Sequence, residues 1–184
     1  MRRIAVTLLV VLASATACGA TSSRPSQSTS AVPAGTKYIS KRYRYEIVLR
    51  GTFVMIPAQI SWDGTFPFGS SGRVDVIVNR QDRKFIVAAK PVPSGMSLSR
   101  WEAFVVRVQR QVCHGLHNFR ASTLGGEPAR EFVSSCPEYE VITLAALHQG
   151  RGYLLNYLSP SSSSPALKRR IYEAGRRAFA FTQK

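Results

Sequence analysis

The sequence is poor in acidic residues, cysteine and histidine, and these shortages argue against several kinds of site. Its 184 residues include ten Asp and Glu, three cysteines and three histidines, against 25 Lys and Arg. A zinc site needs three or four ligands that converge on the ion. The motif Cys113-His114-x-x-His117 supplies at most three, and a disulfide at Cys113, argued below, would remove one of them. We therefore expect no metal centre.

Catalytic and cofactor-binding motifs are also missing. The chain has no Gly-x-Ser-x-Gly elbow, phosphate-binding glycine loop, dinucleotide fingerprint or EF-hand pattern. Its three aspartates, Asp63, Asp75 and Asp82, lie in or beside loop-like stretches. This placement does not favour a Ser-His-Asp triad. We expect a non-enzymatic protein with no catalytic residues and no cofactor. An enzyme with an unrecognised site is the alternative.

The N-terminus has the features of an export signal. Met1-Arg2-Arg3 is basic, and residues 4–13 form an apolar run that is too short to span a bilayer. Small residues then precede Cys18. This arrangement resembles a bacterial lipobox, whose cysteine receives a diacylglyceryl lipid. We expect residues 1–17 to be a lipoprotein signal peptide and Cys18 to be the lipid-attachment residue. An ordinary signal peptide cut nearby is the alternative.

Residues 18–36 are rich in Ser, Thr, Pro, Ala and Gly and predict a flexible tether, with ends roughly 20–25 Å apart. A lipid at Cys18 would hold the following domain at the extracytoplasmic face of the cell membrane. The formal net charge of +15 favours anionic partners. These could be anionic lipid, a phosphate-bearing wall polymer or an acidic protein, whereas the expected location argues against nucleic acid.

Residues 37–184 read as a single domain organised around residues 138–159. This stretch predicts two strands joined at Gln149-Gly150-Arg151-Gly152. The first strand is apolar on both faces, so it must be covered on both sides. Alternating patterns predict further strands at residues 38–49, 53–56, 74–78, 84–89, 117–123 and 129–135.

Two helices complete the predicted domain. The first begins at a capping box of Ser99 and Glu102. Its apolar face consists of Trp101, Val105, Val108 and Val112. The second begins at Pro165, a residue suited to the first helical position. Its apolar stripe consists of Leu167, Ile171, Ala174 and Ala178. The elements together predict an α+β domain whose strands are mostly in antiparallel order.

Several short motifs resemble those of a known family. They are Trp101-Glu102 at the first helix, Leu124-Gly125-Gly126-Glu127-Pro128-Ala129, Gly150-Arg151-Gly152-Tyr153 and a C-terminal helix that ends in Phe179-Ala180-Phe181. Their order resembles the PsbP-like α/β/α sandwich, shared by a lumenal photosystem II subunit, a nuclear import factor and actinobacterial lipoproteins of the LpqN type. The resemblance implies a central, mostly antiparallel sheet with helices on both faces. It also implies binding or adaptor roles without shared catalytic residues.

These observations favour a cell-envelope lipoprotein with a binding or adaptor domain. A carrier of a lipid or small apolar ligand is the alternative. In an exported domain, Cys113 and Cys136 should oxidise to a disulfide, and two buried free cysteines are the alternative. Lys168, Arg169 and Arg170 lie in the first turn of the last helix, where the dipole disfavours cations. We expect them to contact an anionic partner, and a solvated outer face is the alternative.

Overall fold

The central hairpin forms as the sequence predicts. In the computed structural model, which describes residues 35–65 and 72–182, β8 (Tyr139–His148) pairs with β9 (Arg151–Pro160) along its whole length. A two-residue turn joins them, and both Gln149 and Gly150 have positive φ. Such turns match the right-handed twist of the flanking strands. All residues from 141 to 146 are buried, so β8 is covered on both faces.

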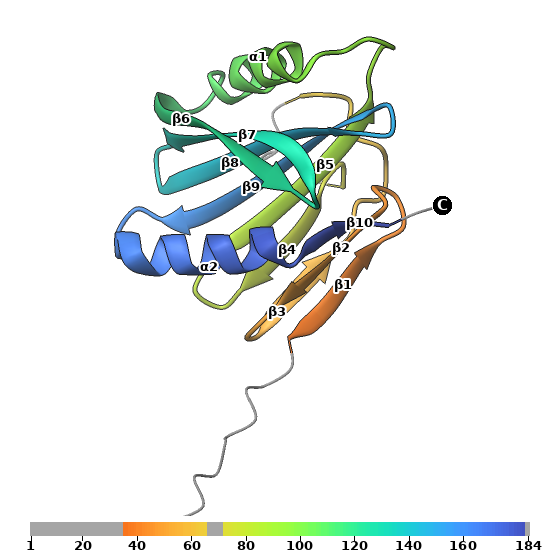
Figure 1. Ribbon diagram of the computed structural model, residues 1–184. Helices are drawn as coiled ribbons and strands as arrows, with labels where there is room; N and C mark the ends of the chain where they lie inside the picture. Colours follow the sequence, from red (N-terminus) through yellow and green to blue (C-terminus); the bar gives the residue numbers. More distant parts are fainter. Residues whose placement is uncertain (1–34, 66–71, 183–184) are drawn as a thin grey trace, which may run out of the picture. The chain divides into compact units, whose positions relative to one another are not determined.

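Five further strands extend the hairpin into a seven-stranded sheet. The strand order is β3-β4-β5-β9-β8-β7-β6, with the hairpin near the middle (Figure 1). Every neighbouring pair is antiparallel. Each added strand matches a predicted strand to within three residues at either end. The five are β3 (Phe53–Ile56), β4 (Asp75–Asn79), β5 (Lys84–Pro91), β6 (His114–Leu124) and β7 (Glu127–Ser135).

A second, three-stranded sheet combines the two ends of the domain. It consists of β1 (Thr36–Ser40), β2 (Tyr45–Leu49) and β10 (Phe179–Phe181), with β2 in the middle. The prediction that the last helix ends in Phe179-Ala180-Phe181 is wrong, because the helix ends at Arg177 and these three residues pair with β2 as a strand. The prediction of one strand over residues 38–49 is wrong, because the chain reverses between β1 and β2. In this turn the Tyr43 N–H donates to Ser40 Oγ, and Arg44 has a φ of 56°. Tyr43 is itself buried. The alternating apolar pattern of β2 therefore begins within the turn, and the sequence pattern does not reveal where the chain reverses.

The two helices pack on opposite faces of the large sheet. On one face, the Trp101 ring of α1 (Leu98–Gln109) covers Gly152, where a Cβ atom would come within 2.5 Å of the ring. On the other face, Tyr172 of α2 (Pro165–Arg177) packs beside Tyr157, with ring centroids 6.3 Å apart. Positions 152 and 157 are an odd number of residues apart on β9, so they face opposite ways.

The small sheet shares the face that α2 covers (Figure 1). Phe181 of β10 packs against Tyr153 of β9 with ring centroids 4.7 Å apart, and Tyr153 points the same way as Tyr157. The expected fold class is therefore confirmed in part. The strands are antiparallel and one helix lies on each face, but a second sheet covers one face together with α2.

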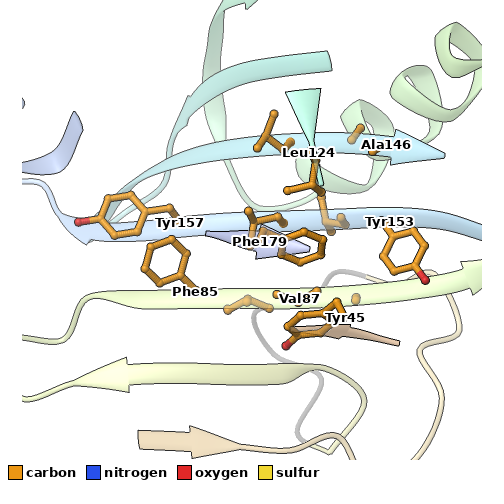
Figure 2. Close-up of a cluster of buried hydrophobic side chains, with 14 of the residues drawn as sticks. Tyr45, Phe85, Val87, Leu124, Ala146, Tyr153, Tyr157 and Phe179 are labelled. Carbon is orange, nitrogen blue, oxygen red and sulfur yellow. The ribbon is translucent and has the colours of Figure 1, made fainter. Parts of the chain in front are cut away.

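An aromatic core fills the space between the two sheets (Figure 2). Tyr45 of β2 stacks on Phe179 of β10 at a centroid distance of 5.0 Å, and Phe85 of β5 packs against Tyr157 of β9 at 4.9 Å. All four side chains are buried. Burying a side chain of this size contributes about 1.5–3 kcal/mol relative to leaving it exposed. The core thus holds β2 and β10, which come from the two ends of the folded domain, against the central hairpin.

α1 begins two residues earlier than the sequence predicts. Its N-cap is Ser97, whose Oγ accepts a hydrogen bond from the Arg100 N–H. The predicted capping box of Ser99 and Glu102 is therefore wrong. Glu102 instead lies 3.5 Å from Arg130 of β7. Two serines two residues apart offer the same capping oxygen, so the spacing alone could not choose between them.

α2 begins as predicted, with Ser164 as N-cap and Pro165 at the first position, but it buries a different face. The predicted stripe of Leu167, Ile171, Ala174 and Ala178 is only partly buried or exposed. The buried residues are Lys168, Tyr172 and Gly175. Gly175 lets the helix approach Phe85, where a Cβ atom would come within 2.5 Å of the ring. The aliphatic stem of a lysine also packs like an apolar side chain. The hydropathy pattern of the sequence therefore did not identify the buried face of α2.

Candidate functional site

The predicted signal peptide and the lipid-attachment residue Cys18 lie outside the described residues. The described part of the chain contains no helix that is both long enough and apolar enough to cross a membrane. The tether prediction likewise concerns residues that mostly precede the described ones. The candidate sites that can be built from geometry therefore all lie in the folded domain.

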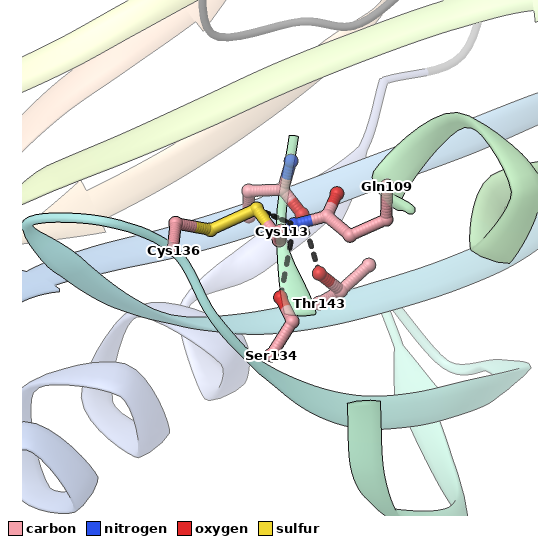
Figure 3. Close-up of a disulfide and its surroundings, with 6 residues drawn as sticks. Gln109, Cys113, Ser134, Cys136 and Thr143 are labelled. Carbon is pink, nitrogen blue, oxygen red and sulfur yellow. Dashed lines mark hydrogen bonds between the residues drawn. A yellow bond between two sulfur atoms is a disulfide. The ribbon is translucent and has the colours of Figure 1, made fainter. Parts of the chain in front are cut away.

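The predicted disulfide is present. Cys113 and Cys136 are bonded, with Cα atoms 4.3 Å apart, and the bond links the chain after α1 to the residue after β7. Figure 3 shows Gln109 beside it. The Gln109 amide is fully buried and donates to Ser134 Oγ at 3.0 Å. The bond and this contact both hold the end of α1 against the large sheet.

The three predicted binding cations of α2 do not form one exposed cluster. Lys168 is buried and donates to the Ser161 carbonyl at 3.2 Å. Arg169 pairs with Glu131 of β7 at 2.9 Å. Arg170 is exposed. Two of the three cations therefore have contacts within the fold that the unfavourable helix dipole did not suggest. Their predicted contact with an anionic partner stays a prediction.

Glu131 is a buried carboxylate at the centre of a polar network. It accepts hydrogen bonds from Arg120 at 2.9 Å, Arg169 at 2.9 Å and the Tyr172 hydroxyl at 2.7 Å. Burial, and next the Glu131 charge, raise the pKa of Tyr172 well above its ordinary value. Because each carboxylate oxygen has a protein donor, this network serves the structure. Sequence reasoning missed it, although a lone acid between Ala129 and Val133 on a strand was a visible signal.

A pocket lies beside the turn between β1 and β2. It has a volume of about 650 Å³ and is bounded by that turn, the segment after β3, and the first residues of β4 and β9. We call it the turn pocket. Its lining residues are Ile39, Ser40, Lys41, Arg42, Pro57, Ala58, Ser61, Asp75 and Arg151.

A buried acid forms one wall of the turn pocket. Asp75 is 1% exposed, and its Oδ1 accepts a hydrogen bond from the Ala58 N–H at 2.7 Å. Its Oδ2 has no hydrogen bond of regular geometry. Burial raises the pKa of the nearby Tyr45 hydroxyl well above its ordinary value, and the Asp75 charge adds to this rise. Asp75 thus places an acidic side chain beneath the pocket surface.

Three cations line the same pocket, namely Lys41, Arg42 and Arg151. Arg42 donates to the carbonyl oxygens of Ala58 and Gln59, at 3.2 and 2.6 Å, and so holds the segment after β3 in place. Lys41 and Arg151 make no ion pair within the described residues. The pocket lining therefore has three positive charges and one negative charge. This arrangement suits a ligand with negative charge, and the sequence did not predict it.

The histidines lie in separate places. His148 pairs with Glu127 at 2.8 Å and stacks on Phe181, with ring centroids 4.1 Å apart. His117 contacts the Gly115 carbonyl at 2.5 Å. In the part of the chain that the structure describes, no group of three or more His, Cys, Asp or Glu side chains could hold a metal ion.

Comparison with known proteins gives the fold but no relative in sequence. No family model matches the chain, and no curated protein matches it. The solution structure of cyanobacterial PsbP (CyanoP) from Synechocystis sp. PCC 6803 is similar, with a TM-score of 0.58, 12% identity, and coverage of 90% of this chain and 98% of that one.

A second similar structure comes from Mycobacterium tuberculosis. It is LpqN, described as involved in cell envelope biogenesis, with a TM-score of 0.53 and 12% identity. The match covers 81% of this chain and 86% of that one. At this identity the similarity concerns the fold alone. The folded domain of this chain therefore has a PsbP-like, LpqN-type fold.

Proposed function

We propose that the chain is a cell-envelope lipoprotein whose folded domain is a non-enzymatic binding module. Its N-terminus would be held at the extracytoplasmic face of the membrane by a lipid on Cys18. The observation that carries the binding role is the turn pocket, which presents Lys41 and Arg151, without ion pairs to any described residue, beside the buried Asp75. Pockets that carry a few polar groups at fixed positions are the usual places for ligands.

The disulfide supports the location outside the cytoplasm. Structural disulfides persist in oxidising compartments and are rare where thiols are kept reduced. The Cys113–Cys136 bond fits an exported domain, and the apolar run at residues 4–13 fits a signal for export. The described role of LpqN in cell envelope biogenesis is consistent with the same location. These three points are independent of the ligand.

The pocket chemistry favours binding over catalysis. A serine nucleophile needs a general base within hydrogen-bond reach. Ser40 and Ser61 line the turn pocket, but its lining includes no histidine. The Ser40 hydroxyl instead accepts a hydrogen bond from the Tyr43 N–H within the turn. The residues of the pocket are suited to holding a charged group in place.

Loss of the lipidation cysteine tests the anchoring. In the native host, Cys18→Ala should move the domain out of the membrane fraction or leave an uncleaved precursor, whereas the tether variant Ser23→Ala should behave as the parent. A Cys18→Ala protein that is cleaved and remains membrane-bound like the parent would show that lipid on this residue is not the anchor. Crosslinking in the native envelope, followed by identification of the captured molecules, tests the binding role.

A further inference from the structure

We infer that the turn pocket binds a phosphate-bearing ligand, with Lys41 and Arg151 as its direct contacts. The inference rests on the proposed role of the domain as a binding module of the envelope. The site differs from the Lys168, Arg169 and Arg170 cluster that the sequence suggests. Two of those three cations are engaged within the fold, whereas Lys41 and Arg151 of the turn pocket have no ion pair among the residues that the structure describes.

The cations of the pocket come from separate parts of the chain, and two of them, Arg42 and Arg151, act on the same tyrosine, Tyr43. Burial raises the pKa of Tyr43 to about 12, and the nearby Arg42 and Arg151 charges oppose this rise. Burial likewise raises the pKa of Tyr153, opposed by Arg151 and Arg44. The β1–β2 turn and the start of β9 therefore bring their guanidinium groups to one place.

Arg151 has unused capacity to bind an acceptor. It lines the turn pocket and makes no side-chain hydrogen bond and no ion pair in the described part of the chain. Arg42, by contrast, already donates to Ala58, Gln59 and Ser61. We therefore treat Arg42 as a positioning residue that shapes the pocket wall, and Arg151 and Lys41 as the groups available to a ligand.

A phosphate group suits these donors. Guanidinium groups bind phosphate through two parallel hydrogen bonds, and lysine adds a compact positive charge. A volume of about 650 Å³ also leaves room for more than the phosphate. The Asp75 charge repels an anion from the wall that it occupies. The ligand should therefore place its phosphate near Lys41 and Arg151 and a hydroxyl or amino group toward Asp75, as a glycerol phosphate unit can.

The chain places this pocket close to the predicted tether. β1 begins at Thr36, and its last residues, Ile39 and Ser40, line the pocket. A strand rises about 3.3 Å per residue, so Lys41 lies within about 17 Å of the start of the domain. A domain anchored at Cys18 could thus bring the pocket near phospholipid headgroups. A soluble or wall-borne phosphate ester is the other source of the same chemistry.

The test uses the full chain carrying Cys18→Ala, so that no lipid contributes. Nuclear magnetic resonance titration with sn-glycerol 3-phosphate measures the soluble ligand, and sedimentation with phosphatidylglycerol vesicles, against phosphatidylcholine vesicles, measures the headgroup. The pocket variant is Lys41→Gln with Arg151→Gln. The matched control is Arg100→Gln with Arg107→Gln, which removes the same charge from two exposed residues of α1, outside both the pocket and the predicted cation set of α2.

We expect the pocket variant to bind at least about tenfold more weakly and the control to change less than about twofold. If the parent binds glycerol phosphate and the pocket variant does not, the ligand is a soluble or wall-borne phosphate ester. If the pocket variant loses binding only to vesicles, the ligand is a lipid headgroup. The inference is overturned if the parent binds neither probe, or if both variants lose the same affinity. Either result would leave the anchoring at Cys18 untouched, because fractionation of the Cys18→Ala variant tests it separately.

Discussion

The Tyr172 hydroxyl of α2 donates a 2.7 Å hydrogen bond to the carboxylate of Glu131 on β7, although the two residues are 41 positions apart in the sequence. Glu131 Oε1 also lies 2.6 Å from Nη2 of Arg120 and 2.9 Å from Nη1 of Arg169. A carboxylate that is 1% exposed needs such donors, because a buried charge without partners is strongly unfavourable. The contact joins the last helix to the large sheet.

Removing this carboxylate should destabilise the domain. We expect Glu131→Ala to lower the free energy of unfolding by about 2–3 kcal/mol, because it leaves the buried Tyr172 hydroxyl without its acceptor. The value lies below that for a fully buried ion pair because Arg120 and Arg169 are 49% and 40% exposed and can reach water. Urea unfolding measures it. Glu138→Ala, at an exposed position, is the control and should stay within about 0.5 kcal/mol. Equal midpoints for the two variants would contradict a structural role for Glu131.

The first-turn cations of α2 should differ in their effect on stability. Lys168→Gln and Arg169→Gln should each lower the free energy of unfolding by about 1 kcal/mol, because Lys168 loses its bond to the Ser161 carbonyl and Arg169 its pair with Glu131. Arg170→Gln should stay within about 0.5 kcal/mol, since this side chain is exposed. Thermal or urea unfolding of the single variants decides this. If all three behave alike, the contacts described for Lys168 and Arg169 do not contribute to stability.

Alkaline pH should weaken the fold through its buried tyrosines. Burial raises the pKa of Tyr43 and of Tyr157 to about 12, while tyrosine in an unfolded chain titrates near about 10. Between these values the folded chain keeps protons that the unfolded chain loses. The stability is therefore fully present below about pH 10 and falls as the pH rises toward 12.

The alkaline prediction can be checked with two measurements. The urea midpoint at about pH 11 should lie below that at about pH 8. Tyrosinate absorbance should show groups that ionise only when the chain unfolds. A midpoint that stays the same between these pH values would contradict the prediction, as would complete ionisation of the tyrosines in the folded state.

The disulfide should be needed for full stability. Bonding Cys113 to Cys136 closes a loop with a sequence separation of 23, and cross-linking a loop of this size contributes roughly 3 kcal/mol in the chain-entropy model. The double variant Cys113→Ala with Cys136→Ala should lose about this much in urea unfolding. Mass spectrometry of protein alkylated during extraction should recover a peptide that links the two cysteines. Recovery of both as alkylated thiols would show that the bond is absent in the cell.

Features of the fold that depend on nearby residues could be predicted from the sequence. The hairpin of β8 and β9 follows from an apolar strand next to Gln149-Gly150, which favours a tight turn. Ser164 and Pro165 predict the start of α2 because both act on the backbone of the first turn. The disulfide could be predicted from the expected export and from the presence of two cysteines in the domain. The PsbP-like fold could be recognised from short motifs together with the order of elements.

Only the tertiary structure decided which polar side chains are buried and which remain available. Lys168 and Gly175 form part of the buried face of α2 because the stem of one and the missing side chain of the other fit against the sheet. The turn pocket brings Lys41 and Asp75 together with Arg151 from far along the chain. A charge interacts through space with groups that folding brings near it. No local pattern in the sequence records those distances. The sequence alone therefore determined the two helices and the strands of the large sheet, whereas the small sheet and the pocket beside it depended on contacts between distant parts of the chain.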